Sequence, residues 1–173
     1  MRIATLADRS EVISALSEIL IEVVANGGSV SFMHPLAPEV AAKFWEDSLT
    51  AAKAGRRVVL GASDGDDLVG TVTLDLATPP NQPHRAEIAK LMTRISHRGR
   101  GIARRLMLEA ERIAVERGRT LLVLDTAEDG GAARLYERLG YRRVGVIPDY
   151  ALKPHGGLTG TIIYFKPIGP CAA

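Results

Sequence analysis

Residues 85–125 read "RAEIAKLMTRISHRGRGIARRLMLEAERIAVERGRTLLVLD", and this stretch decides the fold class. It begins with the alternating apolar residues of a strand and continues with apolar residues at helical spacing over 101–117. It ends with a second strand-like run at 120–125. A strand, a helix and a following strand form a crossover unit whose two strands run parallel. We therefore expect strands 88–92 and 120–125 to be parallel.

The other elements complete one mixed α/β sheet with helices packed on it. Helical spacing predicts three more helices, at 8–25, 38–54 and 131–139. Strand-like runs predict four more strands, at 56–63, 68–77, 141–147 and 161–166. The first two of these strands are separated by "DGDD", which is a hairpin signal. No linker or repeat divides the chain, so we expect residues 1–173 to form a single domain.

Composition indicates a globular protein, with 46% hydrophobic and 24% charged residues among 173. The net charge of +2 gives no overall preference for nucleic acid. Cys171 is the only cysteine, so one chain cannot build a disulfide framework or a cysteine-based metal site. Serines and glutamates interrupt the most apolar segment, 12–25, and the N-terminus lacks a signal-peptide core. We expect a soluble cytoplasmic protein with no metal, membrane or nucleic-acid partner.

Positive charge gathers at the start of the central helix, within "SHRGRGIARRLM" at 96–107. Four arginines come before the first carboxylate of this helix, Glu109: Arg98, Arg100, Arg104 and Arg105. A helix N-terminus already carries partial positive charge, so this arrangement is unfavourable without an anion. Gly99 and Gly101 allow free backbone amides to approach such a ligand closely. The pattern predicts a phosphate or pyrophosphate site, the alternative being a solvated basic turn.

Two common nucleotide-binding motifs fit this turn less well. The P-loop pattern GxxxxGK[ST] does not occur. A dinucleotide fingerprint is closer, since "GRGIAR" supplies two of its three glycines and Asp125 ends the next strand. Arg104, however, stands at the third small position, where the helix must pack closely on its strand.

Another pattern fits better. "RGRGIA" at 98–103 matches Q/R-x-x-G-x-G/A through Arg98, Gly101 and Ala103, and it resembles motif A of the GNAT N-acetyltransferase superfamily. "AARLYERLGYRRVG" at 132–145 resembles that superfamily's next segment, in which a helix carrying a tyrosine leads into "LGY" and a strand. Five further segments look like the tabtoxin-resistance type of acetyltransferase: "GGSVSFMHPL", "RAEIAKLM", "LLVLDT", "GYRRVGVIPDYAL" and "TIIYFK".

The resemblance implies the single-domain GNAT fold, with a mixed, mostly antiparallel sheet and helices on both faces. The sheet would splay between strands 88–93 and 121–125, and acetyl-CoA would enter the splay. Backbone groups at 91–93 would face its pantetheine arm, an amide near Met92 would polarise the thioester carbonyl, and amides at 99–104 would hold its pyrophosphate. The implied cofactor-binding residues are Leu91, Met92, Thr93, Arg98, Gly99, Arg100, Gly101, Ile102, Ala103 and Arg104. Arg134 and Arg138 are further candidates for the outer phosphates.

The same resemblance implies catalytic roles. Tyr136 stands at the family's general-acid position, where a phenol can protonate or stabilise the departing CoA thiolate. Glu87 and Asp125 are candidates for the base that deprotonates the amine, directly or through water. We favour Asp125, which ends its strand at the edge where α/β sheets bind ligands. The family often has Asn seven residues before the tyrosine; Asp129 stands there, which puts that cofactor contact in doubt.

The implied reaction is direct acetyl transfer to a primary amine in a ternary complex. The subtype suggests a small amino-acid-like acceptor, such as a toxin or antibiotic. Loop 29–36, which contains His34, and the glycine-rich connection 150–158 would border the acceptor site, and the connection could flex as a lid.

Several alternatives stay open at this point. One is a non-catalytic acyl-CoA-binding sensor domain. Another is an enzyme of the same superfamily acting on a polyamine, an aminoglycoside or a peptide N-terminus. Nucleic-acid binding through the arginine-rich helix is disfavoured by Glu109, Glu111 and Glu116. The protein is expected to be a monomer or a homodimer, since strand 161–166 could lie at a sheet edge or be covered.

Overall fold

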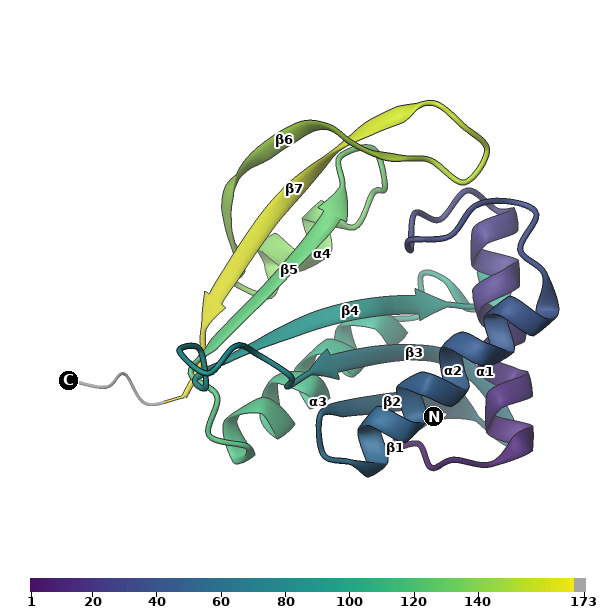
Figure 1. The fold of residues 1–173 in the computed structure, drawn as a ribbon, viewed down its shortest axis with the longest axis horizontal. Helices are drawn as coiled ribbons and strands as arrows, with labels where there is room; N and C mark the ends of the chain where they lie inside the picture. The colour runs from purple at the N-terminus through teal and green to yellow at the C-terminus, as the bar shows by residue number, and fades with distance from the viewer. Residues whose placement is uncertain (170–173) are drawn as a thin grey trace.

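A computed structural model describes residues 1–169 and contains one seven-stranded sheet flanked by helices (Figure 1). The strands are β1 (Arg2–Thr5), β2 (Arg57–Asp64), β3 (Asp67–Asp75), β4 (Arg85–Thr93), β5 (Leu121–Ala127), β6 (Arg142–Leu152) and β7 (Leu158–Pro167). The helices are α1 (Ser10–Ala25), α2 (Pro38–Lys53), α3 (Ile102–Glu116) and α4 (Ala133–Arg138), with a 3₁₀ turn η1 (Ile95–His97). The expected mixed α/β fold is confirmed, while Cys171 lies outside the described residues.

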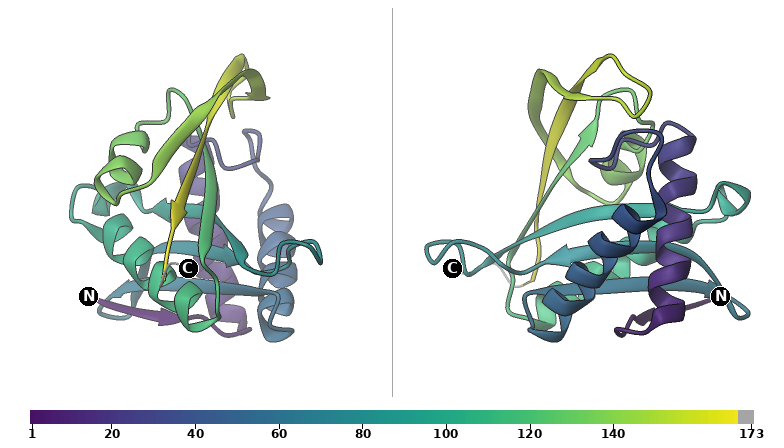
Figure 2. Two further views of the ribbon diagram at one scale, coloured as in Figure 1. Left: turned by 90° about the vertical axis from the view of Figure 1, so that its left-hand side faces the viewer. Right: turned by 45° about the vertical axis from the view of Figure 1, so that its right-hand side comes forward.

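The strand order is β1-β2-β3-β4-β5-β7-β6. Helices α1 and α2 cover one face of the β1–β4 half and α3 covers the other (Figure 2). Each face has its own buried cluster of apolar side chains, one built on α1 and α2 around Trp45, the other on α3. Trp45 is thus a core residue, as expected for an apolar position on a packed helix.

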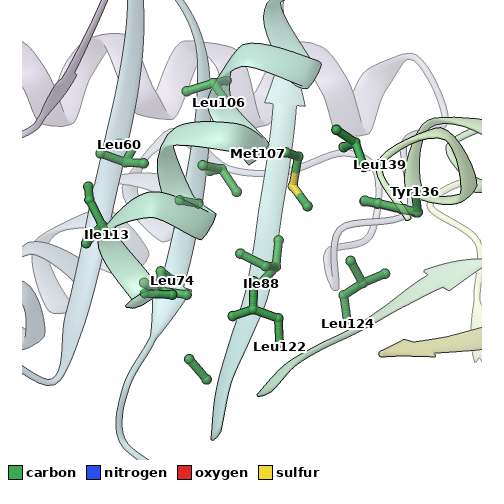
Figure 3. Close-up of a cluster of buried hydrophobic side chains, with 14 of the residues drawn as sticks. Leu60, Leu74, Ile88, Leu106, Met107, Ile113, Leu122, Leu124, Tyr136 and Leu139 are labelled. Carbon is green, nitrogen blue, oxygen red and sulfur yellow. The ribbon is translucent and has the colours of Figure 1, made fainter. Parts of the chain in front are cut away.

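Helix α3 packs on the sheet through a stripe of apolar residues at helical spacing, and Figure 3 shows Leu106 and Met107 among Leu60, Leu74 and Ile88. A glycine in β3 permits the close approach. A Cβ on Gly70 would stand only 3.0 Å from Ile102 Cγ2. The small residue that lets helix and strand meet therefore lies in the sheet, and Arg104 is exposed on α3.

Strands β4 and β5 are the parallel pair that the crossover pattern predicts, but they pair over a short stretch. The ladder joins Arg85–Glu87 to residues 121–123 and then stops. Beyond it the two strands diverge, as Figure 1 shows. A bulge accompanies the divergence: Ala89 and Met92 pair with Thr73 and Thr71 of β3, so β4 carries one extra residue there. Lys90, within the bulge, has a left-handed φ of 51°.

Strands β1 and β6 differ from the sequence-based expectation, and the position of β7 decides an alternative that the sequence left open. Strand β1 was not predicted, because it has only four residues and lacks a buried face. Strand β6 continues past Pro148 to Leu152, with a register shift between Ile147 and Ala151. Residues 150–152 and 158 of the 150–158 connection therefore belong to strands, and the turn between them is confined to 153–157. Strand β7 lies inside the sheet, so the edge is β6.

Within residues 1–169, no helix has both the length and the apolar character needed to cross a lipid bilayer.

The buried stripe of α3 can be tested by truncating one side chain. Leu106 is 0% exposed, whereas Leu108 on the same helix is 40% exposed. Leu106→Ala should lower the free energy of unfolding by about 3 kcal/mol, because the cavity it leaves lies in the packed core. Leu108→Ala should cost less than about 1 kcal/mol. Urea unfolding followed by circular dichroism measures both values, and equal losses would contradict this packing.

Candidate functional site

A cleft of about 1200 Å³ opens where β4 and β5 separate. It runs from the N-terminal end of α3, past the diverging strands, to the β6–β7 hairpin. Most of the residues that the resemblance implicated line it: Leu91, Met92, Thr93, Arg98, Gly99, Gly101, Ile102, Ala103, Arg104, Asp125 and Tyr136. The same fold feature, the splay, thus brings the candidate cofactor-binding and catalytic residues to one cavity.

The glycine–arginine loop, residues 98–104, forms one end of the cleft. Gly99 and Gly101 have φ values of 77° and 74°, in the left-handed region that favours glycine. Gly101 is the N-cap of α3, and the first turn of this helix has neither an acidic residue nor a side-chain cap. Its first amides therefore lack partners within the helix and are available to an anion.

The start of this loop is anchored to α1. Arg94 donates to Glu18 Oε2 at 2.8 Å and lies 3.3 Å from Glu22 Oε2. The amide of Ile95 donates to the other oxygen of Glu22 at 2.8 Å. These contacts hold the exit of β4 against α1, so the loop leaves the sheet in a fixed direction.

Four arginines line this end of the cleft, from the loop, α3 and α4: Arg98, Arg104, Arg134 and Arg138. Arg100, in contrast, does not line the cleft. Its Nη1 lies 3.8 Å from Asp64 Oδ2. Cationic side chains and free amides together provide a site for a multiply charged anion.

Tyr136 enters the cleft from α4 and is only 6% exposed. Its ring packs against those of Tyr141 and Tyr164, with centroid separations of 5.9 and 5.8 Å. Burial raises the pKa of the Tyr136 phenol well above its ordinary value, and the nearby carboxylate of Asp125 raises it further. The phenol therefore stays protonated at physiological pH and can act as a hydrogen-bond donor.

The two candidate bases lie in different surroundings. Asp125 lines the cleft and accepts a hydrogen bond from Thr161 Oγ1 at 3.0 Å. It also borders a smaller cavity of about 190 Å³, which Glu87 and Tyr150 line. Glu87 lies outside the main cleft's lining and 3.5 Å from Arg85 Nη1. Asp125 is therefore the carboxylate that faces both sides of the splay.

Asp129 is held by its own partners at the β6–β7 end of the cleft. It accepts hydrogen bonds from Lys153 Nζ and Thr159 Oγ1, each at 3.1 Å. The hydrogen bond from Lys153, followed by the one from Thr159, holds the pKa of Asp129 below its usual value. The carboxylate thus ties β5 to the hairpin.

The loop after α1 reaches the β6–β7 turn. The amide of His34 donates to Pro154 O at 2.9 Å, and the His34 and His155 rings lie 4.5 Å apart. Residues 29–31 and 150–153 line the cleft from these two segments. His34 itself lies outside the described lining and serves to join the two segments. Within residues 1–169, no three His, Cys, Asp or Glu side chains gather to hold a metal ion.

Sequence reasoning missed Lys90, which lines the cleft at the β4 bulge. A lysine in a predicted strand does not by itself indicate a binding site. The bulge that displaces Lys90 could not be predicted either, because no glycine or proline marks it in the sequence.

A family model, a curated relative and solved structures all relate this chain to acetyltransferases. The model of the acetyltransferase (GNAT) family matches residues 27–141. N-acetyltransferase 8B of Rattus norvegicus is 34% identical over 86 residues, which are 49% of this chain and 39% of that protein. The chain thus spans about two fifths of the length of that curated relative.

Solved structures share the fold over nearly the whole chain. An N-acetyltransferase from Staphylococcus aureus Mu50 has a TM-score of 0.82 at 17% identity, covering 98% of this chain and 100% of that one. The yncA protein of Salmonella typhimurium, solved with its cofactor acetyl-CoA, has a TM-score of 0.79 at 16% identity, covering 99% and 96%.

The anion site can be tested with two neighbouring arginines of α3. Arg104 lines the cleft, whereas Arg105 is an exposed arginine outside its described lining. Arg104→Ala should weaken coenzyme A binding roughly 3- to 10-fold at low salt, and less at high salt, because the lost contact is a screened charge pair. Arg105→Ala should change the affinity less than about 2-fold. Calorimetric titration at two salt concentrations measures this, and equal effects of the two variants would exclude a directed contact.

Proposed function

Because the chain belongs to the acetyltransferase (GNAT) family, we propose that it is an acetyl-CoA-dependent N-acetyltransferase whose acceptor is the primary amine of a small, amino-acid-like molecule. One observation carries the proposal: a single cleft joins an anion-binding helix start, an open strand edge, a buried phenol and a carboxylate. Each of these has a role in acyl transfer from a phosphate-bearing thioester.

In this proposal the cleft binds acetyl-CoA along its length. The amides of the glycine–arginine loop and the arginines beside it bind the pyrophosphate and outer phosphates. Past Glu87, β4 has no ladder partner in β5, which leaves backbone groups at Leu91, Met92 and Thr93 for the pantetheine arm. An amide near Met92 donates to the thioester oxygen and stabilises the negative charge that develops there.

The transfer removes two protons from the substrate nitrogen and requires stabilisation of the departing sulfur. Asp125 accepts a proton from the substrate ammonium, directly or through water, and the amine lone pair attacks the thioester carbonyl carbon. The C–N bond forms, the C–S bond breaks, and the electron pair leaves on sulfur as the CoA thiolate. The attacking nitrogen then passes its second proton to that sulfur or to water, which leaves a neutral amide. Direct attack requires no acyl-enzyme, consistent with a cleft that holds both partners at once.

Tyr136 stabilises the departing sulfur. A thiol has an ordinary pKa of about 8.5, below that of even an unperturbed tyrosine, and burial raises the pKa of Tyr136 further. Complete proton transfer from this phenol to a thiolate is therefore uphill. A charge-assisted hydrogen bond to the sulfur is the contribution that its chemistry supports.

A thiol-release assay with acetyl-CoA tests the proposal over a panel of amino acids, dipeptides, polyamines and aminoglycosides. Release that depends on an amine supports an enzyme, and the active members of the panel define the acceptor class. Tight coenzyme A binding without release from any member would instead indicate a non-catalytic sensor.

Removal of the phenolic hydroxyl tests the role of Tyr136. Tyr136→Phe should lower kcat roughly 10- to 100-fold, because the thiolate loses its donor, while the affinity for acetyl-CoA stays within about 2-fold. Tyr141→Phe is the control, since that ring packs on Tyr136 but lies outside the described lining. Steady-state kinetics measure kcat for both variants, and a Tyr136→Phe enzyme as fast as the parent would remove the residue from catalysis.

Amide substitutions can likewise distinguish the roles of Asp125 and Glu87. Asp125→Asn should lower kcat/KM roughly 100-fold near neutral pH, and Glu87→Gln less than about 3-fold. The Asp125→Asn defect should shrink as pH rises, because more of the amine is then already deprotonated. A pH–rate profile with one acceptor measures this, and a larger defect for Glu87→Gln would reverse the assignment.

A further inference from the structure

Lys90 is a cationic side chain in the cleft that the transfer chemistry above does not use. It lies at the β4 bulge, on the side of the cleft formed by the loop after α1. That loop reaches the β6–β7 turn. The Lys90 ammonium lies near the ring of Phe44 on α2, and α2 covers the face of the sheet opposite α3 (Figure 2). It therefore lies on the side away from the helix that carries the glycine–arginine loop. This is the side of the cleft at which the family resemblance places the acceptor.

The ammonium of Lys90 is held in one place by three neighbours. Its Nζ donates to Ser31 Oγ at 3.2 Å and lies 5.9 and 5.5 Å from the ring centroids of Phe32 and Phe44. Such ring contacts stabilise a cation and orient it. Ser31, like Lys90, has a left-handed φ, at 74° and 51° respectively. Strained non-glycine backbone of this kind concentrates at functional sites.

The charge of Lys90 has no close counterion. Among the ion pairs of residues 1–169, none includes Lys90, so no carboxylate oxygen lies within 4.0 Å of Nζ. Burial, and then the charge of Arg57, lower its pKa, while Asp125 and Glu87 act in the opposite direction. A partly desolvated ammonium without a counterion is unfavourable by itself, and an anionic group of a ligand would relieve it.

We propose that Lys90 binds a carboxylate of the acceptor, so that the substrate class is a small molecule bearing both a primary amine and a carboxylate. This inference rests on the proposed function. Ser31 accepts from Lys90, which leaves its own hydroxyl hydrogen to donate to the same carboxylate.

Charge complementarity extends across the splay. Asp125 on β5 faces the cleft with negative charge and Lys90 on β4 faces it with positive charge. A zwitterionic acceptor would place its ammonium toward Asp125 and its carboxylate toward Lys90. Polyamines and aminoglycosides carry only positive charge, so they would meet Lys90 as a like charge and be disfavoured.

The test uses matched acceptor pairs, in which each amino acid is compared with its own primary amide. The parent enzyme should turn over the acids with a kcat/KM roughly 10- to 100-fold above that of the amides, because only the acids offer a carboxylate. Lys90→Met should remove most of this preference by lowering the rate with acids and leaving the rate with amides within about 3-fold. Lys90→Arg should retain part of the preference, since it keeps the charge.

Three controls accompany the comparison. Lys43→Met changes an exposed lysine of α2 that pairs with Asp47, and it should leave the preference intact. Coenzyme A affinity should be the same for Lys90→Met as for the parent, which shows that the variant is folded and that its cofactor site is unaffected. Mass spectrometry after incubation with acetyl-CoA alone should find Lys90 unmodified.

The outcomes separate the two proposals. Equal turnover of acids and amides by the parent, or an equal loss of both in Lys90→Met, overturns the inference while leaving acetyl transfer intact. Acetylation of Lys90 itself would also overturn it, because the residue would then be an acceptor and not an anchor. Absence of amine-dependent release from every acceptor overturns the proposed function, whether or not coenzyme A binds, and the inference with it.

Discussion

The site depends on one constraint, the early end of the parallel pairing between β4 and β5. The ladder joins three positions on each strand, and the bulge around Lys90 then redirects β4. Two strands of one sheet normally satisfy each other's backbone groups along their full length. Because these two stop pairing, an opened edge with free hydrogen-bonding groups and a cleft of about 1200 Å³ lies within the sheet.

Contacts on both faces of the sheet hold the elements that border the splay. On one face, α3 packs closely against Gly70 and places the glycine–arginine loop at the cleft. On the other face, Arg94 binds Glu18 and Glu22 of α1. The arginines at the start of α3 oppose the helix dipole and lack an acidic neighbour in the first turn. An unliganded cleft therefore leaves unfavourable charge at one end, and a bound pyrophosphate would offset it.

The long elements could be predicted from the sequence. Helices such as α1 and α3 bury one apolar stripe, and β3 is rich in the β-branched residues typical of strands. The glycine–arginine loop could be located from its charge and glycines, and the proposal that it belongs to an acetyl-CoA site came from resemblance. Strand β1 and the far half of β6 could not be predicted, since none of their residues is buried. The position of Lys90 in the cleft could not be predicted for a different reason, because it depends on a bulge that forms when β4 pairs with β3.

The central claim is that the splay between β4 and β5 is the binding site for acetyl-CoA. Its most direct test is an amide-resolved NMR titration of the full chain with coenzyme A. The largest shifts should occur at the amides of residues 91–93 and 99–104, which belong to the opened strand edge and the start of α3. Saturable binding that leaves these amides unperturbed, or no binding at millimolar coenzyme A, would contradict the account.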